Sequence, residues 1–267
     1  MAGVLMIDQV SEIISNRKVA ENTFLMALDS PEIASSAIPG QFVMVRVGNG
    51  LDPLLRRPFS LCGIDGDGLI FCLYRIVGRG TSILSRMNTG ETLSVLGPLG
   101  KGFPAPEKQE HALLVAGGMG IAPLIFLSEK IKSALSGFFA GYGSSRDLVQ
   151  FADLNLGDSK ISIATEDGSA GHKGLVTDLL EAGLVQLPEG MSKVYACGPL
   201  PMLKAVSAIT AGKNVPCQVS LEASMACGLG ACQGCAVKVG LDGGTEYGHV
   251  CQDGPVFDAN VVDWEAL

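Results

Sequence analysis

The sequence predicts a β plus α/β protein, in which an antiparallel β-barrel precedes a doubly wound parallel α/β domain and a small cysteine-rich subdomain. Short apolar segments separated by turn residues fill the first hundred residues, as in closed antiparallel sheets. From residue 111 strand and helix patterns alternate, which predicts a parallel sheet covered by helices. Four closely spaced cysteines lie near the C-terminus. We place the three domains at residues 1–104, 105–212 and 213–267.

Composition and charge argue against several classes of protein. The chain has 267 residues, 47% of them apolar, which is enough for a sizeable core. Its net charge of −8 disfavours nucleic acid or an anionic membrane as a partner. The longest uncharged stretch, residues 112–128, is broken by glycines and a proline and is too short to span a bilayer. Residues 1–10 lack the basic start of a signal peptide, so we expect a cytoplasmic protein with reduced thiols.

The first domain is expected to consist of short strands. Segments at residues 4–10, 18–28, 41–47, 69–77 and 92–96 are apolar, often alternating, and bounded by Gly, Pro, Asn or Asp. No helical period appears before residue 110, apart from a short turn at 81–87. A closed barrel or a sandwich is the natural arrangement for so many short strands.

Two clusters in this domain have the composition of a ligand site. Residues 56–60 (Arg-Arg-Pro-Phe-Ser) combine cations, a rigid turn, an aromatic ring and a hydroxyl. Residues 74–82 form a strand end and a glycine-rich turn, in which Thr81 or Ser82 is placed to cap a short helix that would attract phosphate. Either cluster alone is also typical of a solvated turn. Together they predict a dinucleotide site, with arginine for pyrophosphate and aromatic side chains for a flat ring.

The second domain follows a connector rich in Gly and Pro at residues 97–107, and we place the boundary between residues 100 and 110. Strands are expected at 112–116, 137–141, 160–165 and 193–197, and helices at 121–135, 175–185 and 201–210. This alternation predicts a doubly wound sheet that binds ligands at the carboxyl ends of its strands.

Two glycine turns lie at those carboxyl ends. The first reads Gly-x-Gly-x-x-Pro from Gly118, with Pro123 where the Rossmann motif has its third glycine. On its own this turn is equally typical of close packing between a strand and a helix. The second turn follows the fourth strand at Cys197-Gly198-Pro199 and places another flexible backbone at the same edge of the sheet.

The C-terminal cysteines have the most specific spacing in the chain, C-x4-C-x2-C followed by fifteen residues and a fourth C. This is the plant-type ferredoxin arrangement for a 2Fe–2S cluster, because one short loop wraps three thiolates around two irons. Interspersed glycines let the loop bend and turn N–H groups toward sulfur. Zinc is the main alternative, but sites of four cysteines usually use two close pairs. The predicted ligands are Cys227, Cys232, Cys235 and Cys251.

The order of these motifs resembles the ferredoxin–NADP reductase superfamily. The resemblance rests on Arg57-Pro58-Phe59-Ser60, on Gly80-Thr81, on the turn from Gly117 to Pro123 and on Cys197-Gly198-Pro199. With the cysteine motif appended, nearly the whole chain is similar to the electron-transfer subunits of bacterial NAD-dependent dihydroorotate dehydrogenases. The resemblance implies an FAD-binding barrel, an NAD-binding α/β domain and a 2Fe–2S subdomain.

The resemblance also implies a role for each site residue. Arg57 would hold the FAD pyrophosphate, with Pro58 and Phe59 beside it and Ser60 near the reactive edge of the flavin. The adenine and ribitol side would be lined by Leu73, Tyr74 and Arg75, and the phosphates by Gly80 and Thr81. The NAD site would comprise both glycine turns, which contain Gly117, Gly118, Gly120, Cys197, Gly198 and Pro199.

The resemblance further implies a partner. In the family a catalytic subunit carries FMN and oxidises dihydroorotate to orotate, and two copies of each subunit form a heterotetramer. Electrons would pass from that FMN through the cluster and FAD to NAD. FAD is needed between them because NAD accepts only a hydride, whereas the cluster carries one electron at a time. The chain has no evident general acid or base for substrate chemistry, as expected if the substrate lies on the partner.

Several alternatives stay open. The same module is similar to the small subunit of an NADH-dependent ferredoxin–NADP oxidoreductase or of a sulfide dehydrogenase, although such relatives can replace one cluster cysteine by Asp. A redox sensor would use the cluster without oxidising NADH, and a stand-alone reductase would turn over without a second subunit. Ser144, Ser145 and Arg146 follow the second strand and suit either a 2′-phosphate or a helix start, so the choice between NAD and NADP stays open.

Overall fold

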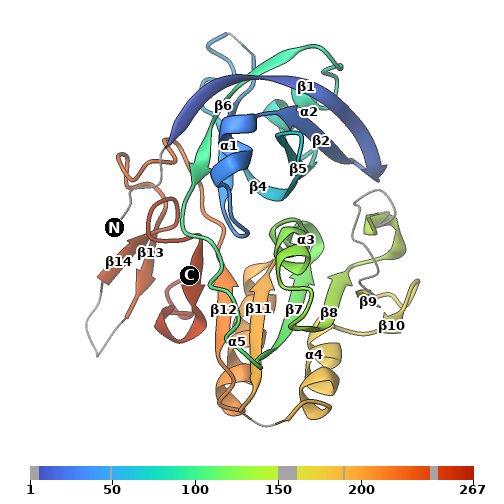
Figure 1. The fold of residues 1–267 in the computed structure, drawn as a ribbon. Coiled ribbons are helices and arrows are strands. Elements are labelled where there is room, and N and C mark those ends of the chain that lie inside the picture. Colours follow the sequence, from blue (N-terminus) through green and yellow to red (C-terminus); the bar gives the residue numbers. More distant parts are fainter. Residues whose placement is uncertain (1–5, 49, 150–160, 189, 241–245) are drawn as a thin grey trace.

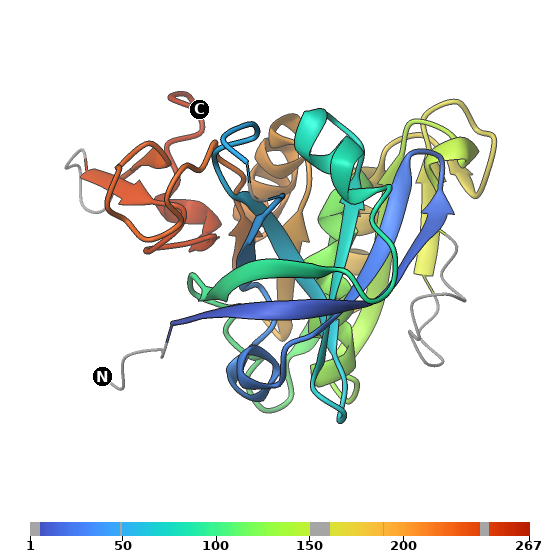
Figure 2. The same ribbon diagram turned by 90° about the horizontal axis from the view of Figure 1, so that it is seen from above.

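The computed structural model describes residues 6–48, 50–149, 161–188, 190–240 and 246–267. Within these ranges the chain forms a closed barrel, a seven-stranded sheet and a two-stranded hairpin. The barrel lies above the large sheet in Figure 1, and the hairpin with its cysteine loop lies to one side of both. Seen from above, the cysteine lobe projects beside the barrel and next to the edge of the sheet (Figure 2).

The barrel contains six antiparallel strands in the spatial order β1-β2-β5-β4-β3-β6. Alternate side chains point inward and fill it with large apolar groups, among them Ile13, Met26, Leu61 and Ile70, all fully buried. The strands are β1 (Ile7–Ala20), β2 (Thr23–Asp29), β3 (Phe42–Arg46), β4 (Arg57–Ile64), β5 (Leu69–Arg75) and β6 (Thr92–Leu99).

The structure corrects the predicted elements of the barrel in three places. The segment at 18–28 is not one strand, because a tight turn with Asn22 in the left-handed region (φ 52°) separates β1 from β2. Strand β4 was not predicted, because its first residues are Arg57 and Pro58. Helix α1 (Pro31–Ser36) was not predicted either, since six residues carry no readable period. The start of the strand predicted at 4–10 lies outside the described residues.

The large sheet has the order β10-β9-β8-β7-β11-β12-β15, with β15 antiparallel to β12. The chain runs outward from β7 in one direction and then crosses to β11 on its other side, which is the doubly wound pattern that the sequence predicted. Its strands are β7 (His111–Gly117), β8 (Leu135–Tyr142), β9 (Ile161–Thr165), β10 (His172–Lys173), β11 (Ser192–Cys197), β12 (Cys217–Ser220) and β15 (Val256–Asp258). Residue 160, predicted to begin the third strand, lies outside the described residues.

Helices cover both faces of this sheet. Along β7 the even-numbered apolar residues pack with α3 (Ile121–Lys130), and Leu113 and Val115 pack with α4 (Val176–Val185) and α5 (Leu200–Gly212). Helix α3 lies between the sheet and the barrel, where it packs against β4 (Figure 1). It is shorter than the predicted helix at 121–135, because the chain leaves the helix after Lys130 and begins β8 at Leu135.

The C-terminal segment contributes both to the sheet and to a separate lobe. Strands β12 and β15 extend the large sheet, while β13 (Ala236–Val239) and β14 (Glu246–His249) form the hairpin that carries the cysteine loop. The sheet therefore continues past the domain boundary expected at residue 212. None of the helices in the described ranges is long and apolar enough to span a membrane.

Candidate functional site

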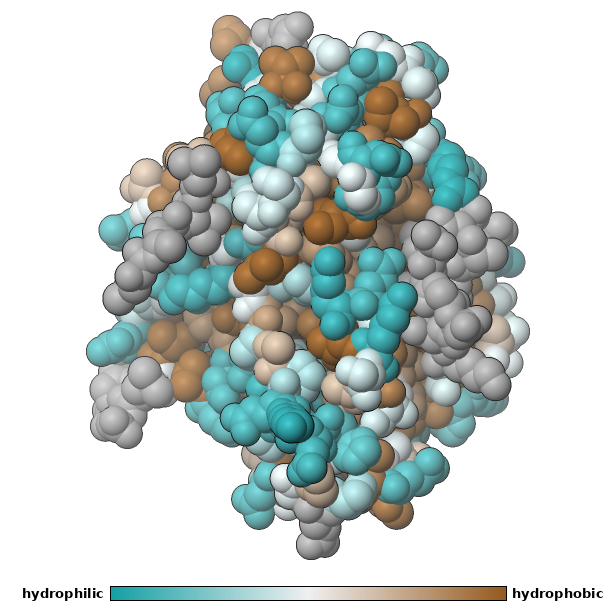
Figure 3. Space-filling view, viewed as in Figure 1, coloured by the Kyte–Doolittle hydropathy of each residue, from teal (hydrophilic) through white to brown (hydrophobic). Residues whose placement is uncertain are grey.

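A cavity of about 370 Å³ lies where the barrel meets the large sheet. Apolar surface is visible in this middle zone of the molecule (Figure 3). The barrel side of the cavity is formed by β4, β5 and the start of α2 (Arg79–Leu84), and the other side by the ends of β11 and β12 and the segment that follows β12. Its lining includes the predicted residues Arg57, Pro58, Phe59, Ser60, Leu73, Tyr74, Arg75 and Thr81.

The two predicted clusters of the barrel meet at this cavity. A methyl group on Gly80 would lie 3.0 Å from Arg57 Nε, so a larger residue there would have to displace the arginine side chain. Arg57 Nη1 donates to Leu55 O at 2.6 Å, which fixes the side chain along the cavity rim. Thr81 is not the N-cap that the sequence predicted; its hydroxyl accepts from Val77 N at 3.0 Å and from Gly78 N, the actual cap.

Aromatic side chains form the barrel wall of the cavity. The Tyr74 ring stacks on Phe24 with centroids 5.6 Å apart and meets Phe59 at the same distance in a tilted geometry. The Tyr74 hydroxyl donates to Asn16 Oδ1 at 2.9 Å. Burial raises the pKa of Tyr74 to about 12. These rings are rigid, so the wall they form is set before any ligand binds.

The opposite wall carries a thiol and a carboxyl group. Cys197 ends β11, and its burial, followed by the nearby Glu222 carboxylate, raises the pKa of the thiol to about 12. Glu222 lines the cavity two residues after β12, and loss of contact with water raises the pKa of its carboxyl group. At neutral pH Cys197 is therefore a neutral thiol.

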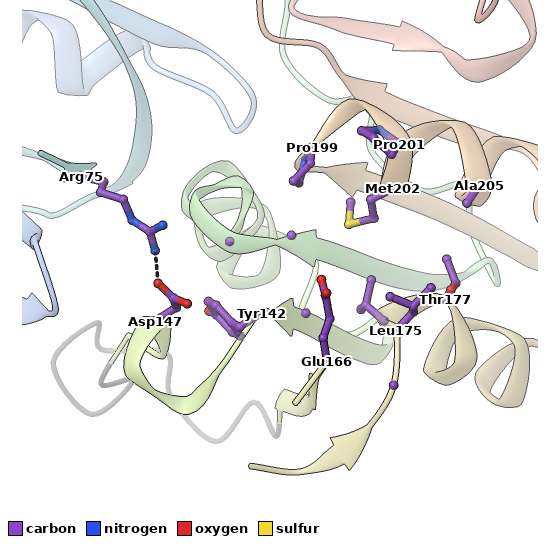
Figure 4. A pocket seen from close by; sticks show the side chains of 16 residues that line it. Arg75, Tyr142, Asp147, Glu166, Leu175, Thr177, Pro199, Pro201, Met202 and Ala205 are labelled. Carbon is purple, nitrogen blue, oxygen red and sulfur yellow. Dashed lines mark hydrogen bonds and ion pairs between the residues drawn. The ribbon is translucent and has the colours of Figure 1, made fainter. Parts of the chain in front are cut away.

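A second cavity, of about 420 Å³, lies at the carboxyl ends of β7, β8, β9 and β11. Of the residues predicted for a nucleotide, Gly117, Gly118 and Pro199 line it, while Cys197 lines the first cavity instead. Figure 4 shows Glu166, Leu175 and Thr177 on one side of the space and the start of α5 on the other.

Gly120 and Gly198 line neither cavity. A methyl group on Gly120 would collide with the backbone of Cys197, and one on Gly198 would meet Gly117 N at 2.8 Å. These two glycines bring the two strand–helix turns against each other, which is the close-packing role that the sequence left open. The sequence did not identify most of the other lining residues, because positions scattered over strand ends, turns and helix starts form no motif; they include Tyr142, Asp147, Glu166, Leu175, Thr177 and Met202.

Arg75 lines both cavities and links the two domains. Its Nη2 atom donates to Asp147 Oδ1 at 3.1 Å, across the gap between β5 and the turn after β8 (Figure 4). Arg75 Nε and the Tyr142 hydroxyl are both buried without a hydrogen-bond partner among the described residues. Buried donors without partners are rare in folded proteins. These two indicate that a polar ligand completes the second cavity.

The four cysteines occupy the loop before β13 and the turn after β14, with unequal exposure. Cys235 and Cys251 are buried with their sulfurs 3.2 Å apart, Cys227 is half-buried and Cys232 is exposed. Within the described ranges no group of three or more His, Cys, Asp or Glu side chains has the geometry of a metal site. The loop nonetheless places Cys232 beside Cys227 and Cys235 beside Cys251.

Backbone N–H groups point at the sulfurs of this loop. Leu229 N and Cys232 N each donate to Cys227 Sγ at 3.4 Å, and Gly230 N donates to Cys251 Sγ at 3.1 Å. The Leu229 hydrogen bond contributes most to lowering the pKa of Cys227, to about 6. Gly230 has a φ of +77°, which favours glycine at this donor. Burial and the hydrogen bond with Cys235 instead raise the pKa of Cys251 to about 12. The backbone donors aimed at the sulfurs nonetheless fit the ligands of an iron–sulfur cluster.

These features define a class of protein: a reductase of the ferredoxin–NADP reductase type with an added cysteine lobe. The fold matches the ferredoxin reductase of carbazole 1,9a-dioxygenase with a TM-score of 0.70, 21% identity and coverage of 81% of this chain and 68% of that one. A chain in the structure of an NADH-dependent reduced ferredoxin–NADP oxidoreductase matches with a TM-score of 0.84 and 31% identity, covering 99% of this chain and 92% of that one.

Sequence comparison narrows the class. The sequence model of one protein family, the iron–sulfur cluster binding domain of dihydroorotate dehydrogenase B, matches residues 222–263. The chain is 39% identical to the dihydroorotate dehydrogenase B (NAD+) electron transfer subunit of Desulforamulus reducens, over 96% of this chain and 98% of that one. The corresponding subunit of Caldanaerobacter subterraneus is 40% identical over 94% of this chain and 97% of its own length. The chain belongs to the family of dihydroorotate dehydrogenase B electron transfer subunits, which confirms the resemblance.

Proposed function

We propose that this chain carries electrons between a catalytic partner subunit and NAD, through a 2Fe–2S cluster and FAD. The cluster would be held by the four cysteines of the lobe, FAD by the first cavity and NAD by the second. These roles would fall to the barrel (1–104), the α/β domain (105–212) and the cluster subdomain (213–267), the last of which also contributes β12 and β15 to the large sheet. The bound FAD would supply exchange of electrons singly or in pairs, which converts the one-electron chemistry of the cluster into the hydride chemistry of NAD.

One observation carries this proposal. The segment that follows β12 lines the first cavity with Glu222, Ala223 and Met225, and two residues later it supplies the first thiol, Cys227. Its next residue, Gly228, lies against the barrel, where an added methyl group would come within 2.6 Å of Met44. The same short stretch of chain therefore forms a wall of the flavin cavity and begins the cluster loop, which gives electrons a short path between the two.

The residues of the chain would bind and orient the groups rather than transform the substrate. Arg57 offers a fixed cation to the FAD pyrophosphate, and Ser60 lies on the lining beside it. Phe59 and Tyr74 form a rigid wall for flat rings. The backbone of Gly117 and Gly118, with Pro199, shapes the NAD site at the edge where the two cavities approach each other.

The partner is proposed to be a catalytic subunit that contains FMN and oxidises dihydroorotate to orotate, in a cytoplasmic heterotetramer with two copies of each subunit. The assignment follows the names of the relatives at about 40% identity, which describe an electron transfer subunit of such an enzyme. The exposed Cys232 marks the side of the lobe from which a partner would reach the cluster.

The test is the variant Cys232→Ser in the complex with its partner. Reduction of NAD by dihydroorotate should fall below about 1% of wild type, while oxidation of NADH by an artificial acceptor such as ferricyanide is retained. Cys217→Ser serves as the matched control, because Cys217 is buried in the large sheet away from the loop. Retained dihydroorotate-dependent activity in Cys232→Ser would contradict the proposed route.

A second candidate function is favoured by one observation. The chain matches a chain of an NADH-dependent reduced ferredoxin–NADP oxidoreductase over nearly its full length, with 31% identity and a TM-score of 0.84. The second candidate is therefore the small subunit of an enzyme of that kind. Purification of the tagged chain from its own cells separates the two functions. An FMN-containing partner with dihydroorotate-dependent activity supports the first; a larger partner that contains iron–sulfur centres and reduces NADP supports the second.

A further inference from the structure

The second cavity has an unbalanced charge. Among its lining residues the charged side chains are Arg75, Asp147 and Glu166. Arg75 and Asp147 form an ion pair at 3.1 Å, so their charges offset each other. No cation of the described residues forms an ion pair with Glu166. The charge left facing the cavity is therefore negative.

Glu166 lies on the β9 side of the second cavity. It follows β9, two strands away from β7, and neighbouring strands are about 4.8 Å apart. Its backbone N–H donates to Tyr142 O at 3.1 Å, and its side chain points from the strand end into the space below Met202 (Figure 4). The nicotinamide must lie near β7 and β11, where the two cavities approach each other, so the adenosine half of a dinucleotide would lie near Glu166.

The residues that the sequence offered for a 2′-phosphate, Ser144, Ser145 and Arg146, are not part of the cavity lining. Ser144 Oγ accepts from Arg146 N at 3.3 Å and caps a short 3-10 turn, and Arg146 does not line the cavity. Of the two roles that the sequence left open for residues 144–146, the structure shows the helix start, in the form of this 3-10 turn. His172 Nε2 lies 3.1 Å from Asp178 Oδ2, which adds another carboxylate on this side.

The carboxylate next in sequence strengthens the negative field. Hydrogen bonds from Ser169 lower the pKa of Asp167, so this exposed side chain is ionised at neutral pH. Asp167 is not part of the cavity lining, whereas Glu166 is. The rim at the end of β9 carries Asp167 and the exposed Lys173, which pairs with Thr165 in the β10–β9 register, whereas Glu166 is the charged group of this strand end that lines the cavity.

We propose that Glu166 selects NAD(H) over NADP(H) by accepting hydrogen bonds from the hydroxyls of the adenosine ribose and repelling a 2′-phosphate. This inference rests on the proposed function, in which the second cavity takes the nicotinamide coenzyme. A carboxylate at the end of a strand in a doubly wound sheet is suited to the ribose hydroxyls of NAD, whereas NADP sites use a cation there. At about 5 Å in water, repulsion of a doubly charged phosphate amounts to roughly tenfold in affinity.

The experiment compares kcat/KM for NADH and NADPH with ferricyanide as acceptor, in the complete chain with FAD bound. Wild type should prefer NADH by about a hundredfold, the repulsion and the lost ribose hydrogen bonds each giving about tenfold. Glu166→Gln should lower this ratio about tenfold, and Glu166→Arg should lower it further by raising kcat/KM for NADPH. Glu181→Gln, on the exposed face of α4, makes the same change in charge away from the cavity and should leave the ratio unchanged.

The outcomes separate this inference from the proposed function. Equal use of NADH and NADPH by wild type, or an unchanged ratio in both Glu166 variants, would overturn the role of Glu166 while leaving the reductase intact. Oxidation of neither coenzyme by the FAD-loaded wild type would instead remove the proposed function. If Glu181→Gln lowers the ratio of kcat/KM for NADH to that for NADPH as much as Glu166→Gln does, the preference comes from the net charge of the protein, and the inference is also overturned.

Discussion

The two cavities differ in how they are assembled. The first cavity, proposed for FAD and here called the flavin cavity, takes most of its barrel wall from two continuous runs, residues 57–60 and 73–75, that lie on neighbouring strands β4 and β5. The second cavity, proposed for the coenzyme, draws on more and more widely separated stretches, at the ends of β7, β8, β9 and β11 and at the starts of α4 and α5. The first is bounded by stacked rings and an anchored arginine, and the second contains two buried donors without partners.

This difference matches the two kinds of ligand. A group that stays bound through many turnovers gains from a rigid site, because fewer side chains must be ordered on binding. A coenzyme that must leave after each turnover is better served by a cavity whose donors are completed only while it is present. The two cavities meet at Arg75, so changes on either side of that residue should affect one cavity and spare the other.

The largest expected effect is on the flavin cavity alone. Arg57→Ala removes the fixed cation, and the loss of charged hydrogen bonds should weaken FAD binding by about ten- to a hundredfold. Flavin absorbance after gel filtration measures the bound fraction. Arg79→Ala is the control, since Arg79 pairs with Asp52 on the surface. Full flavin content in Arg57→Ala would show that the run at 57–60 does not anchor FAD.

The coenzyme cavity should respond to a single methyl group. In Gly117→Ala the new carbon would lie 2.6 Å from Pro199 Cδ and from Met202 Sδ, and the φ of −119° makes the effect purely steric. We expect the KM for NADH to rise about tenfold with flavin content unchanged. Gly212→Ala adds the same group where nothing lies within 4 Å. A loss of FAD together with NADH binding would mean that the cavities are not independent.

The link between the domains should contribute little to stability. Arg75 and Asp147 are each about one third exposed, so their ion pair is worth less than about 1 kcal/mol and should weaken with salt. A double-mutant cycle with Arg75→Gln and Asp147→Asn, read as the free energy of unfolding at low and high salt, measures the coupling. A coupling above about 2 kcal/mol would identify the pair as a structural bridge rather than a contact that the coenzyme can reorganise.

The smallest effect concerns the carboxyl group in the flavin cavity. Loss of water raises the pKa of Glu222 above its ordinary value of 4.5, so between these two pKa values the folded chain binds more protons than the unfolded one. Stability should therefore fall as pH rises through that window and level off above it. Glu222→Gln removes this component, so the difference in melting temperature between variant and wild type should grow with pH across the window. If the melting temperatures of variant and wild type change in parallel with pH, the pKa of Glu222 is not raised.

Sequence patterns predicted the features that lie within a short stretch of chain, but not the contacts that form when distant strands pair. The cysteine spacing, the run from Arg57 to Ser60 and the alternation of strands and helices are each contained in a short stretch, so they could be read directly. Glu166 and Tyr142 become neighbours only because β9 pairs with β8, and no spacing in the sequence expresses that pairing. Strand β4 was missed for a related reason, since its charged start is acceptable only at the edge of a cavity.

The most direct test of the electron route is reduction of the purified chain by NADH without oxygen, followed by electron paramagnetic resonance of the cluster. With FAD bound, NADH should produce the signal of a reduced 2Fe–2S cluster. In Arg57→Ala from which the weakened FAD has been removed by gel filtration, the signal should be absent with NADH and present with dithionite, since the cysteine loop is unchanged. Equal reduction of the cluster by NADH with and without FAD would contradict the account.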